Sequence, residues 1–282
     1  MDCLNLMTEM PSESVDIILT DPPYLYLTNQ KLDRSFDENR FFSEAKRILT
    51  EDGFIVLFGR GTSFYRWNTL LSLLDFTFKE EIVWNKSYSS SPLLPISRIH
   101  ETISISTKNR GIINKTKIPY VEMKAVDIGK IERDINRLNT VFSSEKIFSA
   151  LTDYFKSGKI HTDGCCIVGP TIASTVSRPN RVVATMSAIE NGMNEKSIIH
   201  LQRKHYGTIH PTQKPVRLLE RLLALVLPKN KMIESVVVFD PFGGSFSTME
   251  AVHNIGCKGI SCEIDLEYFN DGKQRIVDIQ KI

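Results

Sequence analysis

The chain has 282 residues, of which 41% are hydrophobic and 24% are charged, and its net charge is +2. These values are ordinary for a soluble globular protein of one large domain with an insertion, or of two small domains, and the total charge gives no sign of a nucleic-acid partner. No apolar run approaches the about 20 residues of a membrane-spanning helix, and no secretory signal is expected at the N-terminus.

Cysteine usage gives no indication of a metal site or of disulfide bonds. The five cysteines include no Cys-x-x-Cys pair, the spacing that is typical of zinc sites. A reduced, cytoplasmic protein without a metal is therefore expected. The cysteines are Cys3, Cys165, Cys166, Cys257 and Cys262.

The first predicted strand is followed by a turn that could hold an amine. The apolar run Val15–Thr20 is typical of a buried strand, and it stops where Pro22 and Pro23 prevent further ladder hydrogen bonds. The Asp21 carboxylate and the Pro22 carbonyl are two acceptors for the protons of an exocyclic amine, and the Pro22–Pro23 peptide has no N–H to compete. Tyr24 adds a flat ring on which a base can stack.

The next part of the chain alternates helices and strands. This order implies a parallel sheet with right-handed crossovers, in which ligand groups gather at the carboxyl ends of the strands. A later strand at 100–108 alternates apolar and polar residues, so we expect it to be buried on one face only. A polar loop at 28–40 is expected to act as a lid. The other expected elements are helices over 1–7, 41–50 and after Thr62, and strands over 53–59 and from Glu81.

The middle of the chain, residues 109–205, has a different character. Its helix–strand alternation is lost, and residues 109–209 carry a charge of +6, which leaves −4 for the remainder. Such a segment is typical of a surface that lies against phosphates, and a solvated lysine-rich surface has the same composition.

Two further motifs follow this middle segment. A helix is expected to begin near Thr212, a suitable N-cap, and Lys214 beside its N-terminus makes a seat for a carboxylate. Later, a strand ending at Asp240 leads into a turn in which Gly243 lets the backbone approach a ligand closely. The next strand ends in Glu263, 23 positions beyond Asp240, a spacing that suits a carboxylate binding ribose hydroxyls.

Taken together, these motifs resemble those of the beta class of amino-group DNA methyltransferases, which use S-adenosylmethionine. The resemblance implies an α/β, Rossmann-like methyltransferase fold, circularly permuted because the catalytic motif precedes the cofactor motif. It divides the chain into a catalytic and cofactor-binding domain, residues 1–108 and 206–282, and an inserted target-recognition region, residues 109–205. The matching motifs are Asp21-Pro22-Pro23-Tyr24, His210-Pro211-Thr212-Gln213-Lys214-Pro215 and Asp240-Pro241-Phe242-Gly243-Gly244-Ser245.

The resemblance also assigns roles to individual residues. In this family the Asp-Pro-Pro-Tyr motif holds the target amine against the sulfonium methyl group, so the expected catalytic residues are Asp21, Pro22, Pro23 and Tyr24. Phe246 stands where the family has glycine, and its side chain either narrows the cofactor site or packs under the helix. The residues expected to bind the cofactor are Asp2, Thr212, Lys214, Asp240, Pro241, Phe242, Gly244, Ser245 and Glu263.

The expected reaction is transfer of a methyl group from S-adenosylmethionine to the N6 amine of an adenine flipped out of double-stranded DNA. Cytosine-N4 methylation is the alternative, because the same motif holds either amine; Asp21 favours adenine and disfavours glutamine methylation in proteins. A DNA-binding relative without catalysis is the alternative of another class. A homodimer and a restriction endonuclease counterpart are partners that the family allows. The expected DNA contacts are Arg178, Arg181, Arg203 and Lys204.

Overall fold

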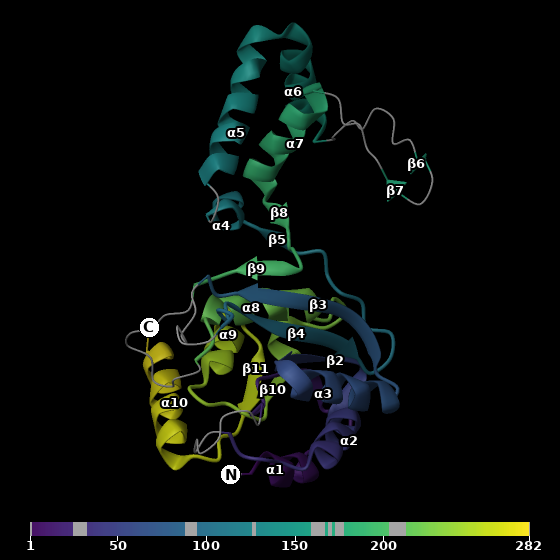
Figure 1. The fold of residues 1–282 in the computed structure, drawn as a ribbon, viewed down its shortest axis with the longest axis vertical. Helices are drawn as coiled ribbons and strands as arrows, with labels where there is room; N and C mark the ends of the chain where they lie inside the picture. Colours follow the sequence, from purple (N-terminus) through teal and green to yellow (C-terminus); the bar gives the residue numbers. More distant parts are fainter. Residues whose placement is uncertain are drawn as a thin grey trace. The chain divides into compact units, whose positions relative to one another are not determined.

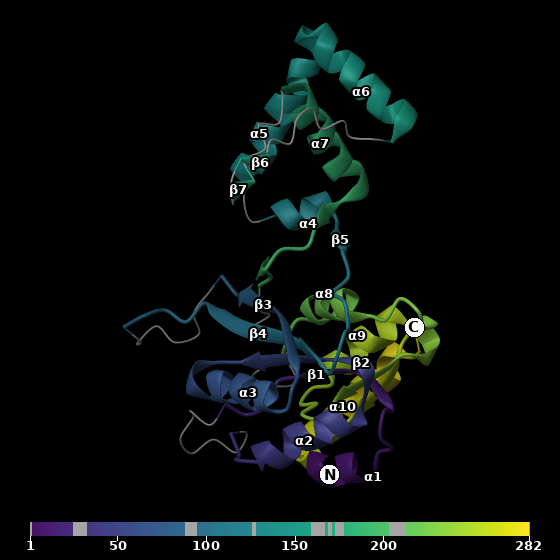
Figure 2. The same cartoon turned by 90° about the vertical axis from the view of Figure 1, so that its right-hand side faces the viewer.

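The computed structural model (Figures 1 and 2) describes residues 2–24, 33–87, 95–125, 128–158, 167–168, 171–172, 178–202 and 213–281. The chain divides into two compact units. Unit 1 comprises Met1–Asn114 and Lys196–Ile282, and unit 2 comprises Lys115–Glu195. The predicted lid at 28–40 lies partly outside the described residues.

The boundaries between the units lie after Asn114 and before Lys196, whereas the predicted boundaries lay after 108 and before 206. The segments 109–114 and 196–205 belong to the sheet domain. The Asn114 side chain donates hydrogen bonds to the carbonyls of Ala224 (3.0 Å) and Leu227 (2.7 Å). On the other side, β9 (Ile198–His200) pairs with β3 (Thr77–Asn85). These contacts join residues that are far apart in the sequence, so the local composition could not reveal the boundaries.

Unit 1 is built on a seven-stranded sheet among its described residues, in the order β11-β10-β1-β2-β4-β3-β9 (Figure 1). Neighbouring strands run parallel from β11 to β2, as the alternation of elements predicted, and again at β3 and β9. The exception is β4, which is antiparallel to both β2 and β3. The remaining strand bounds are β1 Val15–Thr20, β2 Leu49–Gly59, β4 His100–Thr107, β10 Val237–Asp240 and β11 Lys258–Ser261.

The prediction that one face of β4 is exposed was wrong. Ser104 and Ser106, which supply the polar half of its alternation, are buried. The strand lies between two others in a sheet that helices cover on both faces, so an alternating pattern there does not mark a solvent-facing side.

Two apolar cores lie on opposite faces of this sheet. Because successive strand residues point to opposite faces, Ile17 and Leu19 pack with α8 and α9, whereas Ile18 packs with α1, α2 and α3. This arrangement confirms the predicted α/β fold class. The helices of unit 1 are α1 Cys3–Glu9, α2 Glu38–Ile48, α3 Gly61–Leu73, α8 Val216–Val226, η2 Ile233–Ser235, α9 Ser247–Ile255 and α10 Leu266–Ile279.

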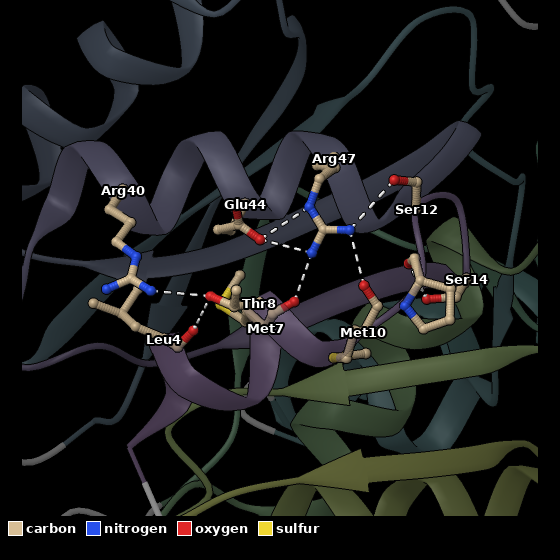
Figure 3. Close-up of polar contacts among 10 residues, drawn as sticks. Leu4, Met7, Thr8, Met10, Ser12, Ser14, Arg40, Glu44 and Arg47 are labelled. Atoms are coloured by element: carbon tan, nitrogen blue, oxygen red, sulfur yellow. Dashed lines mark hydrogen bonds and ion pairs between the residues drawn. The ribbon is translucent and has the colours of Figure 1, made fainter.

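The short helix α1 is held against α2 by one arginine (Figure 3). Arg47 donates hydrogen bonds to the carbonyls of Met7 (2.6 Å) and Met10 (2.8 Å), and it forms an ion pair with Glu44 (2.7 Å). Carbonyls at the end of a helix lack partners within it, and seven residues are too few for a helix that is stable alone. Arg47 therefore fixes the segment that leads into β1.

Unit 2 is mainly helical in its described part. A small core of Val141, Ile147 and Val182 joins its helices, and Asp134 accepts hydrogen bonds from Tyr120, Lys124 and Arg137, each at 2.8 Å. None of the described helices of the chain is long and apolar enough to cross a membrane. The elements of unit 2 are β5 Lys117–Ile118, α4 Tyr120–Lys124, α5 Ile128–Asn139, η1 Thr140–Ser143, α6 Glu145–Ser157, β6 Ile167–Val168, β7 Thr171–Ile172, α7 Arg178–Asn191 and β8 Met193–Asn194.

Candidate active site

The two turns singled out in the sequence lie at the same edge of the sheet. Strands β1 and β10 are parallel neighbours, with Ile17 opposite Val238 and Ile18 opposite Phe239. Asp21 follows the end of β1, and Pro241 follows the end of β10. Parallel strands present their carboxyl ends at one edge, where α/β sheets bind ligands, so both turns lie at the ligand-binding edge of the sheet.

Both carboxylate oxygens of Asp21 have partners. The Tyr24 hydroxyl donates a hydrogen bond to Oδ1, and the Lys214 ammonium donates to Oδ2. The Tyr24 backbone is held in turn, because Ser63 Oγ donates to its carbonyl at 2.6 Å. The ring of Tyr24 lies 6.1 Å from that of Trp67, centroid to centroid. The turn is thus fixed by both its side chains and its backbone.

Lys214 lies between two carboxylates rather than at an open helix end. Its Nζ contacts Asp21 and lies 3.1 Å from Glu101 Oε2. Burial alone would lower the pKa of this lysine, but the Asp21 and Glu101 carboxylates outweigh it and raise the pKa above its ordinary value. Lys214 therefore carries a buried positive charge beside the Asp21 turn.

The predicted helix start was misplaced. Pro215 is the N-cap residue of α8, whereas Thr212 lies outside the described residues. A residue that precedes proline is disfavoured in the helical region, so Lys214 cannot easily continue a helix toward Thr212.

Glu101 was not among the predicted site residues. It lies opposite Trp84 in the pairing of β3 and β4, and its other carboxylate oxygen is 3.0 Å from Lys86 Nζ. Burial raises the pKa of Glu101, but the ammonium groups of Lys214 and Lys86 outweigh this and lower the pKa to about 2. A glutamate in an otherwise buried strand was the available signal, but nothing in the sequence identified Lys214 as its partner.

Side-chain carboxylates also organise the turn after β10. Asp240 accepts hydrogen bonds from Phe242 N (3.1 Å) and from Thr248 Oγ1 (2.5 Å). Glu263 accepts from Gly244 N at 2.8 Å through one oxygen and from the backbone N–H of Asp265 at 2.8 Å through the other. The turn after β10 is thereby tied to the start of α9 and to the segment that leads into α10.

Asp240 has a raised pKa. Burial is the main cause, and the nearby charges of Asp21 and Glu263 add to it, whereas the bonds from Thr248 and Phe242 oppose it. The net result is a pKa of about 7. This buried carboxyl group, at the carboxyl end of β10, therefore changes its charge near neutral pH.

Comparison with known proteins identifies the family. A profile of the DNA methylase family, of the N6-adenine and N4-cytosine type, matches residues 15–274. The chain belongs to this family. It is 29% identical to the type II methyltransferase M.HinfI of Haemophilus influenzae over 52% of this chain and 47% of that protein, about half its length. It is 28% identical to the DNA adenine methyltransferase YhdJ of Escherichia coli K12, over 98% of this chain and 80% of that protein.

Solved DNA methyltransferases share the fold. The complex of M1.HpyAVI with S-adenosylmethionine has a TM-score of 0.56 at 18% identity and covers 98% of this chain and 96% of that one. The cytosine-N4-specific PvuII DNA methyltransferase has a TM-score of 0.57 at 14% identity and covers 99% of this chain and 89% of that one. The methyl donor of the DNA methylase family is S-adenosylmethionine.

The turn after β10 is tightly packed at Gly243. A Cβ added there would lie 2.3 Å from Ser261 Oγ and 2.6 Å from Phe246 Cε1, so these side chains leave no room for a larger residue. Phe246 packs between this turn and α10. Its side chain is buried, its ring lies 5.8 Å from that of Phe269, and a Cβ on Gly272 of α10 would lie 2.7 Å from it.

The remaining predicted residues lie as follows. Ser245 is buried, with its hydroxyl 2.9 Å from that of Ser247, and Asp2 caps α1 by accepting from Leu4 N at 2.7 Å. Helix α7 begins at Arg178 and contains Arg181, which is exposed, whereas Arg203 and Lys204 lie outside the described residues. In the described part of the chain, no cluster of three or more histidine, cysteine or acidic side chains could hold a metal ion.

Proposed function

We propose that this DNA methylase transfers the methyl group of S-adenosylmethionine to the N6 amine of an adenine in a specific sequence of double-stranded DNA. The observation that carries the proposal is the pairing of β1 with β10, which puts the Asp21 turn beside the turn after Asp240. The residues proposed to hold the cofactor are Asp240, Pro241, Phe242, Gly244, Ser245 and Glu263, with Asp2, Thr212 and Lys214 as further candidates. Bound there, S-adenosylmethionine supplies an electrophilic methyl group.

The proposed catalytic role of the first turn follows from the weakness of the nucleophile. The lone pair of an exocyclic amine is delocalised into the base, and acceptors placed where its protons will point favour the pyramidal form with a free lone pair. Asp21 and the Pro22 carbonyl are such acceptors, and acceptors aimed at the amine protons stabilise the transition state electrostatically. Pro23 donates no competing hydrogen bond, and Tyr24 stacks on the base.

Base binding requires an exchange of partners at Asp21. In the structure, the Tyr24 hydroxyl occupies Oδ1. An incoming amine takes that place, which releases the phenol and allows the ring of Tyr24 to stack on the base. The base is flipped out of the duplex, since its amine is otherwise paired and out of reach.

Residues 109–205 are proposed to recognise the DNA sequence. The support is the charge of +6 over residues 109–209, because lysine and arginine neutralise phosphates. Arg178, Arg181, Arg203 and Lys204 are the candidate contacts. Restriction-modification systems offer a context for such an enzyme, with a homodimer and an endonuclease counterpart as further partners.

Adenine is preferred to cytosine as the target for two reasons. Aspartate is the first residue of the motif, which in the resembling family favours adenine. The relative YhdJ, aligned over 98% of this chain, is named a DNA adenine methyltransferase. Cytosine-N4 methylation is the second candidate, because the PvuII enzyme with the same fold is cytosine-N4-specific.

The test is product identification with a matched pair of variants. Purified protein, Asp21→Ala and the exposed control Asp271→Ala are incubated with mixed-sequence duplex DNA and methyl-labelled S-adenosylmethionine, and the DNA is digested to nucleosides. The label is expected on N6-methyladenine, with the rate reduced at least about a hundredfold in Asp21→Ala only. Label on N4-methylcytosine would replace the base but keep the mechanism. Absence of label with retained DNA binding would favour a non-catalytic relative.

A further inference from the structure

We propose that Glu101 is a positioning residue for methyl transfer, acting through Lys214 to keep the Asp21 carboxylate available to the target amine. The inference rests on the proposed function, because it assumes that Asp21 holds that amine. Glu101 was not among the residues predicted to form the site.

The ammonium group of Lys214 is too deeply buried to be solvated by water. Its side chain is 9% exposed, and its ammonium lies 5.0 Å from the ring centroid of Phe58 and 6.0 Å from that of Trp84. A buried ammonium must be compensated by anions or by hydrogen bonds. Among the residues that the structure describes, its carboxylate partners are Asp21 and Glu101.

The four charges form a row in which signs alternate. Lys86 pairs with Glu101, Glu101 with Lys214, and Lys214 with Asp21. The two interior members each have two opposite charges beside them, so the attraction of Lys214 is divided between two carboxylates. Asp21 stands at the end of the row, where it is 24% exposed.

The consequence concerns the second oxygen of Asp21. When Glu101 is ionised, Lys214 is held from two sides and binds Asp21 with only part of its charge. If Glu101 loses its charge, Lys214 retains Asp21 as its remaining carboxylate and binds it more strongly. Asp21 then has less negative charge to offer an amine proton. Methyl transfer is slowed, although neither the cofactor turn nor the DNA surface has changed.

The test separates chemistry from binding in Glu101→Gln. The single-turnover methylation rate is measured at saturating DNA and S-adenosylmethionine, alongside the Kd for each and the Tm. The control is Glu81→Gln, an exposed glutamate on the neighbouring strand β3. Glu101→Asp, which keeps the charge, provides a conservative rescue, and Asp21→Ala reports on the proposed function itself.

We expect Glu101→Gln to lower the transfer rate by at least about tenfold. Both Kd values should stay within about twofold of those of the unaltered protein. Glu101→Asp should recover most of the lost rate. An unchanged rate in Glu101→Gln, with Asp21→Ala inactive, would overturn the inference and leave the proposed function intact. A loss of Tm or of cofactor affinity that accounts for the slower rate would reduce Glu101 to a structural role. Full activity of Asp21→Ala would instead refute the proposed function.

Discussion

Asp240→Asn is expected to change how the stability of unit 1 depends on pH. The pKa of Asp240 in the folded protein is about 7, against an ordinary value of 3.8, chiefly because the group is buried. The folded state therefore retains a proton over a range in which the unfolded state has lost it. Stability from this group is complete at low pH and declines as the pH rises toward 7. Asparagine has a similar shape and no charge to bury.

The magnitude follows from the two pKa values. A folded pKa of about 7 against 3.8 corresponds to a total of about 4 kcal/mol, at 1.36 kcal/mol per pH unit. Between about pH 5 and about pH 8, the free energy of unfolding of the native protein should fall by roughly 3 kcal/mol relative to that of Asp240→Asn. The variant should thus gain relative stability with rising pH.

Tryptophan fluorescence in urea is the suitable assay. Both tryptophans of the chain, Trp67 and Trp84, lie in unit 1, so their emission reports the unfolding of that unit. Asp271→Asn, on the exposed side of α10, is the matched control and should follow the native protein at every pH. Parallel pH curves for the native protein and Asp240→Asn would refute the argument that Asp240 is protonated in the folded state near neutral pH.

Two further variants test packing in unit 1. Phe246→Ala should lower the free energy of unfolding in urea by about 3 kcal/mol, since the ring fills space under α10. The decrease should be about 1 kcal/mol smaller in Phe246→Gly, because Phe246 has a φ of +56°, which glycine adopts without strain. Equal stability of Phe246→Ala and the native protein would contradict the packing. Arg47→Met should lower the free energy of unfolding by about 2 kcal/mol, because the carbonyls of Met7 and Met10 lose a charged donor. The control is Arg40→Met, which removes an exposed hydrogen bond to Thr8. If Arg47→Met destabilises the protein no more than Arg40→Met, Arg47 does not hold α1.

Those parts of the fold that depend on local sequence were predictable. The apolar run before Asp21 and the glycine turn after Asp240 each specify a strand and its end through their own residues. A parallel sheet then brings the two turns to one edge without further information. The antiparallel insertion of β4 between β2 and β3 was not predictable in this way, because strand order is decided by which surfaces pack together.

The charge network beside the site could not be predicted from the sequence. Lys214 looked like part of a helix N-terminus, and its contact with Asp21 joins residues that only the completed sheet brings together. Phe246 illustrates the same difficulty. Its departure from the family motif is accommodated by Gly272, a residue in a different helix, so the sequence around the motif did not decide between the two placements.

The way in which unit 2 is joined to the chain has a consequence for how the protein can change. Its first and last segments pair with each other: Lys117 lies opposite Asn194 in β5 and β8, and Glu195 N donates to the Thr116 carbonyl at 3.2 Å. The two ends of the unit therefore meet within the unit itself. If the residues between these ends were replaced by another segment whose ends also adjoin, the strand pairing of the large sheet would not have to change. The inserted unit can therefore be exchanged as a whole, and its sequence can diverge at a different rate from that of the sheet domain.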